Sequence, residues 1–221
     1  MTSFKYDSRI HYFEITLDNL ESYAVNIEEF LNDKYEEAVS NKGGHVKPIA
    51  QYGVEFPNIM RTSLFYSCFA YLENYLLIIC KEIRRFKKIE IEINDIRHKG
   101  IEKAQVYLKK IAGLKFPDQS SEWNHIKKCN KVRNILIHNG GIIENNNKNV
   151  IKEIETLNSV FIVNNFNRNE INLTASFCFE FINSVREVLR KVYEELILII
   201  NPIGKYQLMI NKLMKDVTDN T

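Results

Sequence analysis

The chain has few of the residues that interrupt regular structure: its 221 residues include only eight glycines and four prolines. No glycine-rich phosphate-binding loop and no internal repeat can be recognised in it. Most of the glycines and prolines fall in clusters, and between the clusters apolar residues recur at helical spacing. The sequence therefore predicts a mostly helical protein whose connections lie at these clusters.

Paired cysteines and a strong net charge are also absent. None of the four cysteines (Cys68, Cys80, Cys129 and Cys178) forms a C-x-x-C pair, and each lies in an apolar segment. This pattern predicts buried thiols in a reducing cytoplasm rather than a disulfide framework. Thirty Lys and Arg against 28 Asp and Glu give a net charge of +2, which excludes a polycation. Any surface for nucleic acid must then be a local patch.

No stretch of the sequence is both as long and as uniformly apolar as a typical membrane segment. The first residues, MTSFKYDSRIHYF, contain charged and polar residues where a signal peptide needs an apolar run. The most apolar segment, Leu64 to Cys80, is interrupted by Glu73 and Asn74 and is short for a membrane span. We expect a soluble, cytoplasmic protein with no membrane association.

Five helices account for most of the chain, which we interpret as a single all-α domain over residues 1–221. The first two are expected from about Thr16 to Val39 and from Pro57 to about Phe86, the second being apolar nearly all round and therefore central. The others are expected at about Ile101–Ala112, Ser121–Asn139 and Thr174–Ile200, with Gly140 and Pro202 as stop signals.

The segment 141–172 differs from the rest, because it is rich in asparagine and carries two runs that favour strands. VFIV (Val160 to Val163) and EINL (Glu170 to Leu173) predict a small β-hairpin near 158–173. Two interpretations of this insertion stay open at this point. It is either a mobile surface insertion or a flap over a site formed by the preceding helix.

The helix predicted at Ser121–Asn139 has the most unusual distribution of side chains. On a helical wheel, Ile126, Cys129, Leu136 and Ile137 define an apolar face, and Arg133 lies in the middle of it. Along one edge of this face, polar side chains follow at i, i+4 and i+8: Asn130, Asn134 and His138. Three lysines lie on the solvent side: Lys127, Lys128 and Lys131.

An arginine on an apolar face is costly unless it is paired or opens onto a polar cavity. One explanation is a structural salt bridge, for which Glu73 in the apolar second helix is an available partner. The other is a cleft in which Arg133 and His138 face a substrate, with Glu73 holding the arginine in place. The sequence leaves both open.

Metal and nucleophile chemistry have weaker candidates. His125 and Cys129, at i and i+4, could supply two zinc ligands, but no matching pair occurs elsewhere in the sequence. A Ser or Cys nucleophile lacks a comparable set of partners. We therefore expect no metal and no cofactor.

The motif R-N-x-x-x-H, present here from Arg133 to His138, resembles the signature of HEPN domains. The flanking residues are similar too, with Val132 before the arginine, Asn139-Gly140-Gly141 after the histidine, and an upstream helix containing YLENYL. The resemblance implies a helical bundle that forms a homodimer, with the motif helices of both protomers meeting in a cleft. It also implies catalytic roles for Arg133 and His138, with Asn134 as the accompanying polar residue.

Many HEPN proteins are metal-independent endoribonucleases of toxin–antitoxin or phage-defence systems, and others only bind or scaffold. We therefore expect RNA cleavage, supported by Glu73 and Asn130, with the three lysines contacting RNA and a cognate antitoxin or defence protein as a further partner. The alternative is a non-catalytic helical module that dimerises or docks a partner protein. Gly140 stands where one toxin group has a modified tyrosine, so regulation of that kind is not expected.

Overall fold

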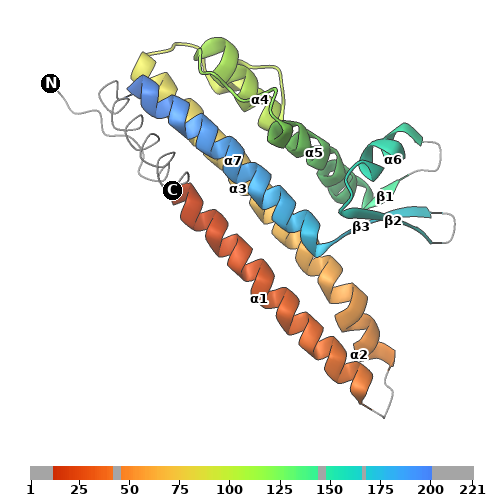
Figure 1. The fold of residues 1–221 in the computed structure, drawn as a ribbon. Coiled ribbons are helices and arrows are strands. Elements are labelled where there is room, and N and C mark those ends of the chain that lie inside the picture. Colours follow the sequence, from red (N-terminus) through yellow and green to blue (C-terminus); the bar gives the residue numbers. More distant parts are fainter. Residues whose placement is uncertain (1–11, 42–45, 144–147, 166–167, 201–221) are drawn as a thin grey trace, which may run out of the picture. The chain divides into compact units, whose positions relative to one another are not determined.

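The computed structural model describes residues 12–41, 46–143, 148–165 and 168–200, and these are mostly helical (Figure 1). Five main helices follow the predicted ranges closely: α1 (Phe13–Ser40), α3 (Phe56–Lys87), α4 (Gly100–Val106), α5 (Ser121–Asn139) and α7 (Ala175–Ile200). The expectation of a mainly helical chain is therefore confirmed. The signal-peptide prediction for the first residues and the stop at Pro202 lie outside the described residues.

Several short elements were not predicted. Helix α2 (Val46–Ala50) and the π-helix η2 (Gln51–Glu55) precede α3, while the 3-10 helix η3 (Ile93–Asp95) precedes α4. A second π-helix, η4 (Tyr107–Ile111), extends α4 and completes the helix predicted there. One of these elements allows a close approach between backbone and ring, because a Cβ on Gly53 in η2 would lie 2.8 Å from Tyr35 Cε2 of α1.

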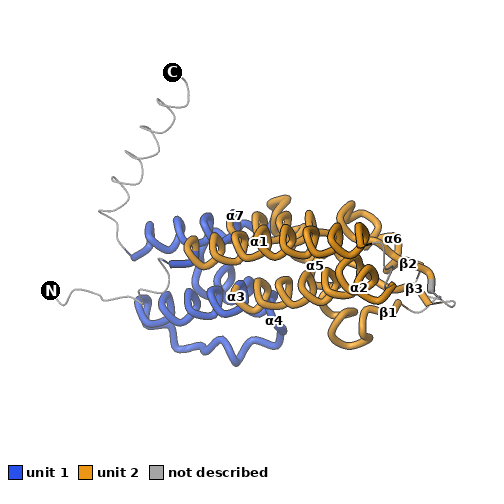
Figure 2. Tube along the Cα trace, turned by 90° about the horizontal axis from the view of Figure 1, so that it is seen from below, with its two compact units in different colours: residues 1–13, 72–118, 187–221 blue, residues 14–71, 119–186 orange. Residues whose placement is uncertain are grey.

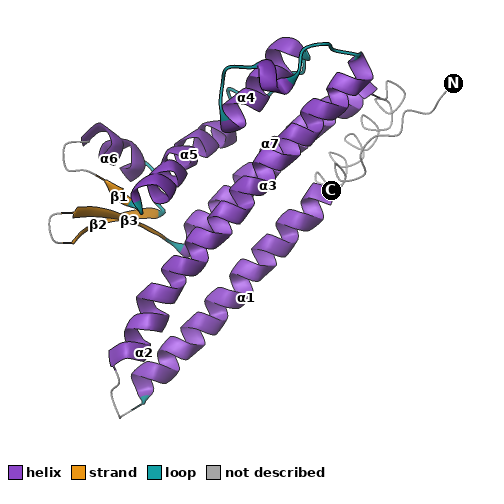
Figure 3. Ribbon diagram, turned by 180° about the vertical axis from the view of Figure 1, so that it is seen from behind, coloured by secondary structure: helices purple, strands orange, loops and turns teal. Residues whose placement is uncertain are grey.

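The predicted hairpin is present as part of a three-stranded antiparallel sheet (Figure 3). Strands β2 (Val160–Asn165) and β3 (Arg168–Leu173) pair from Val160–Leu173 to Asn165–Arg168. A two-residue strand, β1 (Ile142–Ile143), adds to the other edge of β3, giving the order β1-β3-β2. Helix α6 (Lys148–Glu155), also missed by the sequence patterns, lies between β1 and β2 in the chain.

The asparagine-rich insertion is not only a surface feature. Four of its apolar side chains, and Leu173 directly after it, are at most 5% exposed: Ile143, Ile154, Leu157 and Ile171. The sheet and α6 therefore contribute to a hydrophobic core. This differs from the interpretation of the segment as a surface insertion.

Two compact units make up the chain, and the long helices α3 and α7 pass through both (Figure 2). Unit 1 comprises residues 1–13, 72–118 and 187–221, and unit 2 comprises residues 14–71 and 119–186. The core of unit 1 gathers side chains from α3, α4, η4 and α7: Leu76, Ile79, Ile83, Ile101, Tyr107, Leu108, Val188 and Val192. Within it the Tyr107 hydroxyl donates a 2.9 Å hydrogen bond to the Ile91 carbonyl.

The core of unit 2 is built around aromatic rings of α3 and α7. Phe65 packs edge-on against Phe177 and Phe181, with ring centroids 5.0 and 4.8 Å apart. Phe69 stacks on Phe181 at 5.7 Å. Trp123, fully buried on α5, is a further large residue of this core. Burying such rings stabilises the fold by about 1.5–3 kcal/mol each relative to exposed rings.

Helix α1 is attached to the rest of unit 2 by ion pairs. Arg61 on α3 binds both oxygens of Glu28, at 2.6 and 2.8 Å, and donates to the Leu173 carbonyl. Arg186 on α7 contacts three carboxylates of α1, those of Glu14, Asp18 and Glu21. These contacts join segments that are more than 30 residues apart in sequence.

The helical stretch Val46–Lys87 is the one described segment that is long and apolar enough to cross a membrane by length and composition. Of its most apolar window, 56% is buried inside the protein. Its hydropathy is that of a helix carrying the cores of both units.

Candidate functional site

Helix α5, which carries the R-N-x-x-x-H motif, has well-defined ends. The Ser120 hydroxyl caps its first turn by accepting a 3.1 Å hydrogen bond from the Trp123 amide. At the other end Gly140 adopts the left-handed conformation, with φ at 58°, and its amide bonds to the Ile135 carbonyl. Glycine is the residue best suited to this conformation, so Gly140 ends the helix one residue after the motif region.

The buried residues of α5 overlap only partly with those predicted for its apolar face. The buried side chains are those of Trp123, Ile126, Cys129 and Val132, whereas Ile137 is 43% exposed. Arg133, predicted in the middle of this face, is half-buried, and Leu136 one turn further along is half-buried as well.

Arg133 lies over an aromatic ring of α3. Its guanidinium carbon is 5.2 Å from the centroid of Phe69, a distance at which a cation is attracted to the face of the ring. Its Nη1 also donates a 3.3 Å hydrogen bond to Asn134 Oδ1 on the next residue. Both contacts hold the charged group at the surface of α5.

Tyr66 belongs to the surroundings of Arg133, and the sequence patterns did not identify it. Partial burial raises the pKa of the Tyr66 phenol, and the nearby positive charge of Arg133 opposes this rise. Tyr66 and Phe69 lie three residues apart on α3, which places them on one side of that helix. Aromatic pairs at this spacing are common in cores, so no sequence pattern indicates that an arginine lies against them.

The other motif residues follow the same edge of α5. Asn134 and His138 are exposed, and Asn130 is half-buried. Their spacing of four residues places them one above another along the helix. The polar edge predicted from the sequence is thus present, with Arg133 beside it.

Two of the three lysines predicted to contact RNA are engaged by helix α6. Lys128 donates a 3.0 Å hydrogen bond to Thr156, and Lys131 forms a 2.5 Å ion pair with Glu153. Lys127 is exposed. An RNA phosphate at Lys128 or Lys131 would therefore compete with these contacts, and an exposed ion pair of this kind contributes at most about 1 kcal/mol to stability.

Glu73, predicted to support Arg133, lies on the part of α3 that belongs to unit 1, whereas Arg133 belongs to unit 2. It is close to the start of α4, because a Cβ on Gly100 would come within 3.0 Å of Glu73 Oε1. The pairing of Glu73 with Arg133 stays a prediction.

His125 and Cys129 contact each other but have the features of a structural pair. His125 Nε2 is 3.5 Å from Cys129 Sγ, and its Nδ1 is 2.8 Å from Ser184 Oγ. Burial raises the pKa of the Cys129 thiol far above its usual range, so it is a poor nucleophile. In residues 12–41, 46–143, 148–165 and 168–200, no three potential Cys, His, Asp or Glu ligands gather around a point.

The remaining cysteines are buried as predicted. Burial raises the pKa of Cys80 and of Cys178 to about 12, and that of Cys68 further. Thiols of this kind behave as small apolar side chains rather than as reactive groups.

Comparisons of the chain with models of protein families, with curated proteins and with solved structures found no match. The residues of α5 therefore have to support a functional proposal by their own chemistry.

Proposed function

We propose that the protein is a metal-independent endoribonuclease of the HEPN type, acting on cellular RNA in the cytoplasm. The observation that supports this most is the polar edge of α5, where Arg133 is held over Phe69 beside the exposed Asn134 and His138. A cation fixed next to a histidine near the end of a helix is the pair that this chemistry requires.

The reaction uses the substrate's own 2′-hydroxyl as the nucleophile. The 2′-oxygen attacks the adjacent phosphorus, the 5′-oxygen leaves, and the products carry a 2′,3′-cyclic phosphate and a 5′-hydroxyl. His138 moves a proton at one of these oxygens, since histidine does this best near neutral pH. Arg133 stabilises the charge that develops on the phosphorane, and Asn134 orients the phosphate or the 2′-hydroxyl.

A homodimer would complete the site. Ile137, a large apolar side chain, is 43% exposed between the motif residues Arg133 and His138. A second protomer that covers this face would exclude water from the cleft and strengthen its electrostatic interactions. We propose a toxin or phage-defence effector of this form, with a cognate antitoxin or defence protein as its further partner.

A non-catalytic helical module is the second candidate, and the contacts of Arg133 favour it. An arginine held by Phe69 and Asn134 can serve to cover the aromatic core, which would make its charge structural. In that case Lys128 and Lys131 serve only to attach α6.

The test is to incubate the purified protein with single-stranded RNA and with DNA in the presence of EDTA. We expect cleavage of RNA with 2′,3′-cyclic phosphate ends and no cleavage of DNA, which lacks the nucleophile. His138→Ala should lower the rate by at least about a hundredfold, the loss typical of a positioned acid–base group. His98→Ala, a change at an exposed histidine of unit 1, is the matched control and should cleave normally.

Intact RNA across several RNA classes would favour the non-catalytic module. Cleavage abolished by EDTA would exclude the proposed mechanism. Light scattering at micromolar concentration should show a dimer, and a monomer would contradict the shared cleft.

A further inference from the structure

The two units differ in charge, and the basic one is not the one that carries the motif. Residues 81–118 of unit 1 contain eleven Lys or Arg against six Asp or Glu, a net charge of +5. Residues 14–71 of unit 2 contain four against nine, a net charge of −5. The chain as a whole has a net charge of only +2, but residues 81–118 form a basic region that would attract an anionic partner.

Part of this patch is a built cleft at the C-terminal end of α3. The cleft has a volume of about 600 Å³ and is lined by four basic and two acidic side chains together with Ile89: Lys81, Arg84, Arg85, Lys88, Glu82 and Glu90. Lys81, Arg85 and Lys88 are exposed. A concave surface that gathers several cations favours an anion that can contact more than one of them.

Three acidic side chains accompany the four basic ones, Glu82 and Glu90 in the lining of the cleft and Glu92 beside it, which leaves a small positive charge. Arg85 is ion-paired with Glu82 at 2.8 Å, and Arg84 contacts Glu92 at 2.9 Å. Lys81 and Lys88 add two exposed ammonium groups at the ends of the row.

Lys88 occupies a position at which glycine is preferred. Among the described residues it is the one non-glycine with a positive φ, 53°, and it directly follows the last residue of α3. There the Ile89 amide bonds back to the Arg84 carbonyl at 3.0 Å, which closes the helix. A side chain in this conformation costs energy, so the lysine needs a reason other than local geometry.

The spacing of these cations suits a nucleic-acid backbone. Lys81 and Arg85 are four residues apart on α3, which places them on one side of the helix, about one turn or about 5–6 Å apart. Lys88 follows the last residue of the helix and lines the same cleft. Consecutive phosphates of an extended single strand have a comparable separation.

We propose that the cleft formed by Lys81, Arg84, Arg85 and Lys88 binds the phosphate backbone of single-stranded RNA. It is a binding surface additional to the polar edge of α5, and the choice of RNA as the polyanion rests on the proposed function. Of the three lysines assigned to RNA from the sequence, Lys128 and Lys131 contact Thr156 and Glu153, and Lys127 is exposed like Lys81 and Lys88 of the cleft.

The experiment measures fluorescence anisotropy of a labelled, unstructured single-stranded RNA, using the His138→Ala protein so that the RNA stays intact. Lys81→Gln with Lys88→Gln should weaken binding at least about fivefold at low salt. The slope of log affinity against log salt should become shallower by about 1–1.5, because about two phosphate contacts are lost. Lys47→Gln with Lys152→Gln removes the same charge from exposed positions of unit 2 and should leave both quantities nearly unchanged.

A second variant separates binding from local structure. Lys88→Gly should raise the melting temperature, because it removes the side chain from a positive-φ position, and should still weaken RNA binding. Affinity unchanged in Lys88→Gly and in the double variant would overturn the proposal. An absence of RNA binding by the parent protein would also overturn it. So would a parent protein that binds poly-glutamate more tightly than RNA, if the cleft variant loses the binding of poly-glutamate and keeps that of RNA.

The outcomes distinguish this proposal from the proposed function. If RNA is bound through the cleft but never cleaved by the wild-type protein, the proposed enzymatic function fails and the proposed binding surface holds. If the variant with Lys81→Gln and Lys88→Gln cleaves RNA with an unchanged KM, the proposed function holds and the proposed binding surface fails.

Discussion

Arg186 and Arg133 are both half-buried arginines on helices of unit 2, and their described contacts differ in charge. The Arg186 side chain is 12% exposed and contacts the carboxylates of Glu14, Asp18 and Glu21. The contacts described for Arg133 are a phenyl ring and a neutral amide. The buried salt bridge that the sequence suggested for Arg133 is thus the arrangement found at Arg186.

This difference has a physical consequence for what each arginine can do. A guanidinium surrounded by carboxylates has its charge compensated, and its donors are used within the fold. A guanidinium on an aromatic face is attracted by the quadrupole of the ring. Arg186 therefore suits the attachment of α1 to α7, whereas Arg133 lies against the core ring Phe69, and the phosphate contact proposed for it is what the following variants test.

The largest expected effect is on the rate of RNA cleavage, compared between a variant of Arg133 and a variant of Arg186. Arg133→Ala should lower the rate of RNA cleavage by at least about a hundredfold, because the developing phosphorane charge loses its cation. Arg186→Ala, assayed at a temperature at which it stays folded, should cleave within a few-fold of the wild-type rate. Equal losses in both variants would remove the functional distinction between the two arginines.

The second effect concerns the free energy of unfolding in urea. Arg186→Met should lower it by about 1–3 kcal/mol, since three carboxylates of α1 are left without their cation. The value is below that of a fully buried pair because Asp18 is 65% and Glu21 37% exposed. Arg133→Met should cost less than about 1 kcal/mol. The reverse order would mean that Arg133 is the structural arginine.

A third and smaller effect should appear at the ring beneath Arg133. Phe69→Leu removes the aromatic face but keeps an apolar side chain in the core. A double-mutant cycle with Arg133→Met should give a coupling of about 0.5–1 kcal/mol. Phe65→Leu, at a ring of the same core, is the matched control and should be additive with Arg133→Met. Additivity at Phe69 would show that the contact contributes nothing.

The smallest effect is a pH dependence of stability at His125. Burial lowers the pKa of this histidine, the carboxylate of Glu180 opposes the shift, and the charge of Lys128 adds to it. Because the folded pKa lies below the unfolded value of about 6.5, the unfolded chain binds the proton more readily. Stability should therefore be lost as the pH falls from about 6.5 through the folded pKa. Melting curves should show that His125→Gln lacks this loss, and a parallel offset at all pH values would contradict it.

The sequence predicted local features well and long-range ones poorly. The end of α5 was found because Gly140 acts on its own helix, as a left-handed residue. The burial of its sides was partly wrong, because the exposure of Ile137 depends on which elements pack there. No pattern could link Arg186 with Glu21, which is 165 residues away in sequence.

Short elements were missed for a related reason. Strand β1 has two residues and exists because β3 offers it hydrogen bonds, so no alternation could reveal it. Helix α6 lies in a segment rich in asparagine, a composition typical of loops, although its Ile154 is buried. For the candidate site, the motif residues were found from their spacing, whereas Phe69 and Tyr66 required the packing of α3 against α5.

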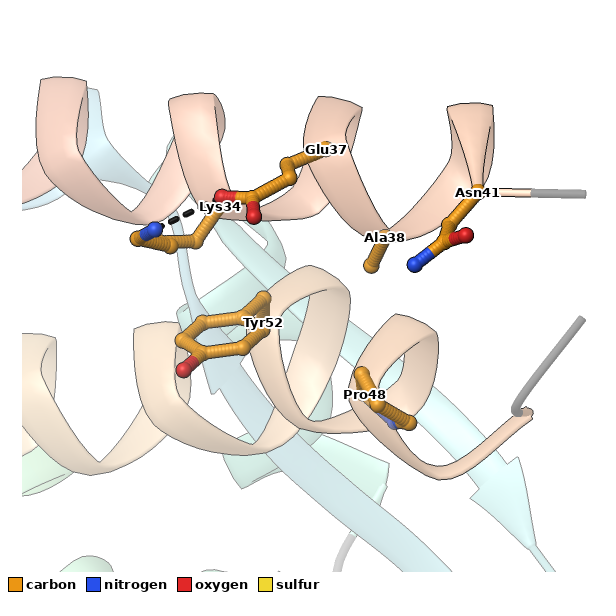
Figure 4. A pocket seen from close by; sticks show the side chains of 6 residues that line it. All are labelled: Lys34, Glu37, Ala38, Asn41, Pro48 and Tyr52. Atoms are coloured by element: carbon orange, nitrogen blue, oxygen red, sulfur yellow. Dashed lines mark hydrogen bonds and ion pairs between the residues drawn. The ribbon is translucent and has the colours of Figure 1, made fainter. Parts of the chain in front are cut away.

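The π-helix η2 lies between α2 and α3 and determines how α2 is rotated about the helix axis. A π-turn closes i to i+5 and so contains about one residue more than an α-turn, which changes the direction of the α2 side chains. A small pocket of about 260 Å³ depends on this direction (Figure 4). In it Pro48 and Tyr52 face Lys34 and Ala38 of α1.

Deleting one residue from Gln51–Glu55 would restore an uninterrupted α-helix and turn everything before it by about 100°. Pro48 would then point away from α1, and the open face of Gly53 that receives the Tyr35 ring would be lost. Homologues of this chain should thus tolerate substitutions in η2, except at Gly53, more readily than a change in its number of residues.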